Sequence, residues 1–159
     1  MTPRFTRLSI VVMAVLIGAA SVASAGSVIY AADTDLLDQL LTEMEIPYEL
    51  VLDEAGDPGW VFTYKGILIT VAAYDKAATG KYESLLFYAG WVAEREVSLA
   101  AINGWNRRAR FGRAYLDELG DPVVELDLLL SGGVTAGTVT AYIDLFVGTV
   151  SDVGVELGL

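Results

Sequence analysis

The chain has 159 residues, 54% of them hydrophobic, and it contains neither cysteine nor histidine. Without cysteine there is no disulfide, thiol nucleophile or cysteine-ligated zinc, and without histidine there is no Ser-His-Asp triad or histidine-ligated metal. We therefore expect no metal site and no cofactor. The 21 acidic residues outnumber the ten basic ones, and such a negative field repels a phosphate backbone, so we expect no nucleic-acid partner.

Residues 1–25 have the pattern of a secretory signal peptide. Arg4 and Arg7 supply the positive charge, residues 8–20 form an apolar run, and Ala23 and Ala25 provide the small side chains that precede a cleavage point. Cleavage after Ala25 predicts an exported protein, periplasmic or extracellular, with no further membrane association. The alternative is a retained N-terminal anchor. Removal of the two arginines leaves eight basic residues against 21 acidic ones, a net charge of −13.

The remainder predicts one domain over residues 34–153, preceded by a flexible lead-in over residues 26–33. Thr34 or Asp33 supplies a helix N-cap, apolar residues follow at helical spacing, and Pro47 ends the helix. From Tyr48 the apolar period changes to two, which predicts strands joined by short turns in an antiparallel meander. The expected strands span residues 48–53, 60–64, 67–73 and 85–91.

Two further helices are expected. Ser98 caps a helix whose basic C-terminal end complements the helix dipole. Thr135 caps a second helix, with apolar residues recurring at helical spacing from Val139 to Val150. The sequence therefore predicts an α+β fold, with a mostly antiparallel sheet of five to six strands flanked by three helices in the order α-β-β-β-β-α-β-β-α.

A hairpin lies between these two helices. The sets that alternate toward the core are Gly112, Ala114 and Leu116 on the first strand, and Val124, Leu126, Leu128 and Leu130 on the second. Both sets reach the same face only if the turn has an odd number of residues, and we expect Leu119–Asp121 or that turn extended by one residue at each end. The small Gly112 and Ala114 would let a helix approach closely.

This turn predicts Arg113 opposite Asp127, Tyr115 opposite Glu125, and Asp117 opposite Val123. The other face then carries Phe111, Arg113, Tyr115, Glu125 and Asp127. Such a mixed charged and aromatic surface is either half-solvated with cross-strand ion pairs, or covered by another chain.

Three patterns could carry chemistry. Glu125 and Asp127 would lie roughly 7 Å apart along one strand face, within reach of the spacing in glycoside hydrolases, although Arg113 would keep at least one of them ionised. Residues 53–57 lack the spacing of a calcium loop and favour a turn. The basic cluster formed by Arg107, Arg108, Arg110 and Arg113 could grip an acidic partner or neutralise the domain's own acids. We expect no catalytic residue.

Residues 97–150 carry a pattern of spaced rare residues. It comprises Asn103, Trp105, Asn106, Arg107, Arg110, Phe111, residues 115–117 with Tyr115 and Asp117, residues 120–121, and residues 125–127 with Glu125 and Asp127. This pattern resembles the YbjN family, described as bacterial sensory transduction regulators. The resemblance implies a fold like that of the type III secretion chaperones, a homodimer, and binding to another protein without catalysis.

We therefore expect an exported, non-catalytic protein-binding module, chaperone-like or regulatory, with an unidentified protein partner. The candidate interaction residues are Asn103, Trp105, Asn106, Arg107, Arg110, Phe111, Arg113, Tyr115, Asp117, Glu125 and Asp127. The chief alternative is a small acid/base hydrolase of envelope polysaccharide that uses Glu125 and Asp127. A structural envelope protein is a third possibility.

Overall fold

The computed structural model describes residues 28–32 and 34–159, and the expected signal peptide lies outside the described residues. Its elements, in chain order, are β1 (Val28–Ile29), α1 (Thr34–Glu43), β2 (Tyr48–Leu52), β3 (Pro58–Tyr64), β4 (Ile67–Lys76), β5 (Tyr82–Gly90), α2 (Leu99–Arg108), β6 (Arg113–Leu116), β7 (Pro122–Leu129), β8 (Val134–Thr135) and α3 (Ala136–Leu157).

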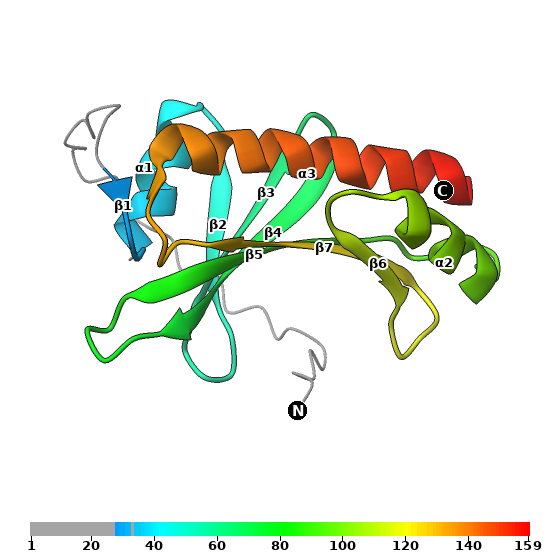
Figure 1. Cartoon of the computed structure of the whole chain (residues 1–159), viewed down its shortest axis with the longest axis horizontal. Helices are drawn as coiled ribbons and strands as arrows, with labels where there is room; N and C mark the ends of the chain where they lie inside the picture. Colours follow the sequence, from blue (N-terminus) through cyan, green and yellow to red (C-terminus); the bar gives the residue numbers. More distant parts are fainter. Residues whose placement is uncertain (1–27, 33) are drawn as a thin grey trace.

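The main sheet has six antiparallel strands in the order β2-β3-β4-β5-β7-β6. Figure 1 shows α3 running across one side of this sheet, with α1 toward one end of the helix and α2 toward the other. The predicted α+β class and element order are confirmed. Two short strands were not predicted. β1, within the segment expected to be a lead-in, pairs with β8, and Ala32 forms a bridge with Tyr82.

The core lies between the helices and one face of the sheet. Alternate residues of the strands point into it, so Trp60 and Phe87 are fully buried there, and Phe146 of α3 packs against Phe87 with ring centroids 5.8 Å apart. Glycine and β-branched residues make α3 a weak helix in isolation, so this packing holds it. Among the described residues α3 is long and apolar enough to cross a membrane, but its apolar stripe belongs to the core.

Of the three predicted N-caps, the one at Thr34 or Asp33 lies outside the described side chains, and the other two are present. The Ser98 hydroxyl accepts a hydrogen bond from the backbone N–H of Ala101, and the Thr135 hydroxyl accepts one from that of Thr138. Each satisfies a donor that the first helical turn leaves unpaired.

The register of the last hairpin differs from the prediction. Arg113 pairs with Glu125 rather than Asp127, and Tyr115 pairs with Val123 rather than Glu125. Asp117 pairs with no strand residue, because its Oδ1 accepts the backbone N–H groups of Leu119 and Asp121 and so begins a five-residue turn over residues 117–121.

The predicted faces are nevertheless correct, because the pairing is shifted by two residues and a shift of two keeps every side chain on its side. Ala114 faces the core opposite Val124. The close approach at Gly112 is also confirmed. A Cβ there would lie 3.0 Å from Cγ2 of Thr149 on α3, and its φ of +72° favours glycine.

Candidate functional site

One face of the main sheet is covered by no described helix. Leu68 and Leu129 are 63% and 62% exposed on this open face, and Tyr74, Tyr88 and Tyr115 are half-buried there. We call this surface the open face. Leu86 and Val123 are buried on it, because neighbouring side chains shield them. A sheet face with partly covered aromatic and aliphatic side chains is a candidate surface for another molecule.

Three of the predicted site residues meet at the β6–β7 end of the open face. The Glu125 side chain is only 6% exposed and accepts bonds on both oxygens. Arg113 donates to Oε2 from Nε at 2.8 Å and from Nη2 at 2.5 Å, and the Tyr115 hydroxyl donates to Oε1 at 2.7 Å. This cluster ties the four-residue edge strand β6 to its only neighbour in the main sheet, β7.

The electrostatics of the cluster favour neutral tyrosines and a charged Arg113. Burial, and then the hydrogen bond to Glu125, raises the pKa of Tyr115 well above its usual value. Burial, and then the nearby Asp117 and Glu125 carboxylates, raises the pKa of Tyr88. The bond to Glu125 raises the pKa of Arg113. The two donors to Glu125, Arg113 and Tyr115, are therefore both held in their protonated forms.

The two carboxylates of the hydrolase alternative have different surroundings in this arrangement. Glu125 is occupied by Arg113 and Tyr115, whereas Asp127 is exposed on the open face. Neither of the two described grooves contains either carboxylate. The larger, of about 820 Å³, lies between β1, α1 and the β4–β5 turn, and the smaller, of about 410 Å³, lies beside Trp91 and the end of α3. Neither of these two grooves therefore brings Glu125 and Asp127 together.

The residues Asn103, Trp105 and Asn106 on α2 have three separate roles. Trp105 is buried in the core and Asn103 is exposed. Asn106 donates from Nδ2 to the carbonyl of Ala114 at 2.8 Å and accepts the Ala114 N–H on Oδ1 at 2.9 Å. Its carboxamide therefore pairs with the outer edge of β6 as a neighbouring strand would.

The basic cluster is dispersed rather than gathered into one patch. Arg108 pairs with Glu156 at 2.6 Å, and Arg113 pairs with Glu125. Arg110 lies over the ring of Phe111, 5.2 Å from its centroid, and Phe111 is 42% exposed. Arg107 is exposed on the last turn of α2. Arg107, Arg110 and Phe111 are thus exposed, while Arg108 and Arg113 are paired with acidic residues of the same chain.

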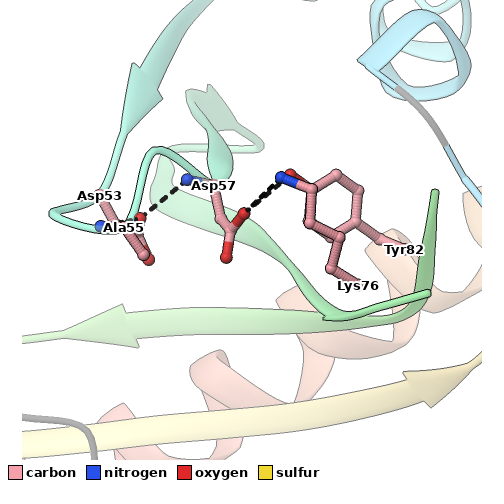
Figure 2. Close-up of polar contacts among 5 residues, drawn as sticks. All are labelled: Asp53, Ala55, Asp57, Lys76 and Tyr82. Carbon is pink, nitrogen blue, oxygen red and sulfur yellow. Dashed lines mark hydrogen bonds and ion pairs between the residues drawn. The ribbon is translucent and has the colours of Figure 1, made fainter. Parts of the chain in front are cut away.

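Residues 53–57 form a turn, as the sequence favoured. Asp53 Oδ1 accepts the backbone N–H groups of Ala55 at 2.9 Å and Asp57 at 2.8 Å. Figure 2 shows the Asp57 carboxylate directed at Lys76 and Tyr82, whose Nζ and hydroxyl lie 3.1 and 2.9 Å away. The Tyr82 bond first, and then Lys76, lowers the pKa of Asp57. Each carboxylate is satisfied by the protein itself.

Nearly the same seven-residue turn sequence occurs twice in the chain, and this repeat was not predicted. Residues 52–58 read Leu-Asp-Glu-Ala-Gly-Asp-Pro and residues 116–122 read Leu-Asp-Glu-Leu-Gly-Asp-Pro. In both, the first Asp captures two backbone N–H groups, the Gly has a positive φ, and the flanking Leu and Pro pair across the strands. The repeat was the signal that could have fixed the register of the β6–β7 hairpin.

Metal binding has no support within residues 28–32 and 34–159. That part of the chain holds no group of three or more acidic side chains arranged for a cation.

Comparison with known proteins supports the fold and identifies the family. The type III secretion chaperone SycH of Yersinia pestis, solved in complex with a stable fragment of YscM2, is similar with a TM-score of 0.52 and 14% identity, over 76% of this chain and 98% of that chain. At this identity the likeness concerns the fold alone. No curated protein matches the sequence significantly. The model of the YbjN family, "Putative bacterial sensory transduction regulator", matches residues 33–158, and the chain therefore belongs to the YbjN family.

Proposed function

We propose that this protein is an exported, non-catalytic module that binds another protein in a chaperone-like or regulatory role. The observation that carries the proposal is the one-sided cover of the sheet, which leaves the open face to a partner. The similarity to a chaperone solved with a protein fragment supports it. The binding of Glu125 by Arg113 and Tyr115 favours a binding module over a hydrolase.

Affinity capture from envelope extract tests this function when it is done with paired variants. Leu129→Glu places a charge on the open face at a side chain that is 62% exposed, so folding should tolerate it. Ala141→Glu makes the same change at an exposed position of α3. We expect the wild type and Ala141→Glu to retain a common polypeptide, identified by mass spectrometry, and Leu129→Glu to lose it.

Two results would contradict the proposal. One is equal capture by all three proteins, which would remove the open face from the interaction. The other is glycan turnover by the purified protein that Glu125→Gln abolishes while the fold, followed by circular dichroism, stays intact.

Export and dimerisation belong to the same proposal. Export rests on the pattern of residues 1–25 and predicts an envelope protein whose mature chain starts at Gly26, which N-terminal sequencing of the fractionated protein tests. The homodimer rests on the chaperone-like fold. Light scattering at micromolar concentration should give twice the mass of the chain, and a strict monomer would remove this part.

A further inference from the structure

The two edge strands of the main sheet differ in whether their outward backbone groups are hydrogen-bonded. β2 and β6 are the edge strands, at opposite ends of the strand order. In each hairpin the first turn Asp donates its backbone N–H to the carbonyl of the last turn Asp. Because bonded and non-bonded pairs alternate in an antiparallel ladder, the flanking Leu–Pro pair is non-bonded. That Leu, and every second residue before it in the strand, therefore directs its backbone N–H and C=O away from the partner strand, toward the outer edge of the sheet.

On β6 the outward position is Ala114, and Asn106 occupies it. Both backbone groups of Ala114 are bonded to the Asn106 carboxamide. An additional strand cannot pair at this edge without displacing Asn106. The cover matches the way in which native proteins block exposed strand edges against unwanted pairing.

On β2 the equivalent position is Leu50, and nothing described occupies it. By the same alternation Tyr48, Leu50 and Leu52 direct their N–H and C=O outward, and among residues 28–32 and 34–159 this strand pairs with β3 alone. The Leu52 side chain is 61% exposed, while Tyr48 and Leu50 are half-buried toward the helices. An edge of this kind can accept an extended segment.

The negative charge around the edge of β2 indicates which side chains a bound segment would have. Exposed carboxylates flank the edge at Glu43, Glu45, Glu49, Asp53 and Glu54. The nearest lysines of the adjoining strands and turns, Lys65 and Lys76, are already paired with Asp144 and Asp57. Two copies of this edge would bring like charges together, and like charges across strands destabilise pairing. A second copy of the chain is therefore a poor occupant.

We propose that the outer edge of β2 takes up an extended segment of another polypeptide in which basic side chains alternate with apolar ones. The apolar side chains lie beside Tyr48, Leu50 and Leu52, and the basic ones lie beside Glu49 on the open face. The inference rests on the proposed function and adds to it the place and the chemistry of the partner.

The test uses a phage-displayed library of random nine-residue peptides selected on the purified exported protein. Selected peptides should alternate Lys or Arg with apolar residues. Each is then synthesised in two versions, one N-methylated at the odd amides and one at the even amides. Only one set of amides faces β2 in strand addition, so one version should lose at least about tenfold in affinity and the other should bind normally.

Charge reversal provides the matched protein variants. Glu49→Lys should weaken the basic peptides about two- to fivefold, the range of an exposed ion pair. Asp152→Lys, the same type of change at an exposed position of α3, should leave affinity unchanged. Peptides that are equally sensitive to both methylation patterns, equal effects of the two variants, or a library that yields no binder would each overturn the inference. The proposed function is decided separately, because capture that depends on Leu129 requires no contact with β2.

Discussion

Substitution of Glu125 by glutamine tests whether this carboxylate is structural. The side chain is 6% exposed and accepts three hydrogen bonds, two from Arg113 and one from Tyr115. Glutamine keeps the shape but replaces one acceptor oxygen with a donor NH₂ group. The carboxamide can keep its oxygen toward Arg113 and turn its NH₂ toward the Tyr115 hydroxyl, which then accepts instead of donating, but the negative charge that pairs with the Arg113 guanidinium is lost.

Removal of one partner from a buried ion pair costs about 3–5 kcal/mol. The cost is smaller here, because the Arg113 side chain is 63% exposed and regains water when its partner is lost. We therefore expect Glu125→Gln to lower the free energy of unfolding by about 2–3 kcal/mol, which is roughly 6–12 °C in Tm for a domain of this size. Urea unfolding followed by circular dichroism measures the change.

Asp127→Asn is the matched control, because Asp127 lies two residues away on the same strand and is exposed. It should change the free energy of unfolding by no more than about 0.5 kcal/mol. If Glu125→Gln also stayed within that range, the cluster would not hold β6 on the sheet, and a functional role for Glu125 would regain support.

Four further changes test the fold around the site. Asn106→Ala frees both backbone groups of Ala114, so it should cost about 1–2 kcal/mol and speed hydrogen exchange at the Ala114 amide relative to the central strands. Gly112→Ala combines a φ of +72° with a Cβ 3.0 Å from Thr149 and should cost about 1–3 kcal/mol in urea unfolding, whereas Gly148→Ala, with open space at its Cβ, should be neutral or stabilising. Burial and Asp38 raise the pKa of Tyr48 to about 12. Folding therefore favours the neutral form of this tyrosine, and the free energy of unfolding should fall as the pH rises from about 10 to 12. Tyr48→Phe should flatten this decline. Asp57 has a lowered pKa because of Tyr82 and Lys76, so its contribution is present above its unfolded value and is lost as pH falls through the folded value, and Asp57→Asn should reduce the acid sensitivity of Tm.

The elements that the sequence predicts are those with a strong period and a strong end signal. The third helix has both, since its apolar residues recur at helical spacing and Thr135 caps it. Parity alone also assigned the faces of the last hairpin, because side chains alternate strictly along a strand. Its register depended on where the turn begins, and Asp117 decides this through two local hydrogen bonds that parity does not reveal.

The candidate site was predicted in its membership but not in its arrangement. Asn103, Trp105 and Asn106 are close together in the sequence. The helix nevertheless directs them to solvent, to the core and to the edge of β6, in that order. Alternation likewise assigned Glu125 to an exposed strand face. It is buried because two side chains of β6 bond to it: Arg113, which the actual register places opposite it, and Tyr115, which lies opposite Val123 and reaches it on the diagonal.

The most direct measurement of the central claim is site-specific photo-crosslinking in living cells. A photoreactive amino acid is placed at Leu68 or Leu129 on the open face, at Leu52 on the edge of β2, and at Ala141 on α3 as the control. We predict covalent adducts with a second polypeptide from the face and edge positions and none from Ala141. Adducts from Ala141 alone, or from none of the four positions, would contradict a partner on the open face or at the outer edge of β2.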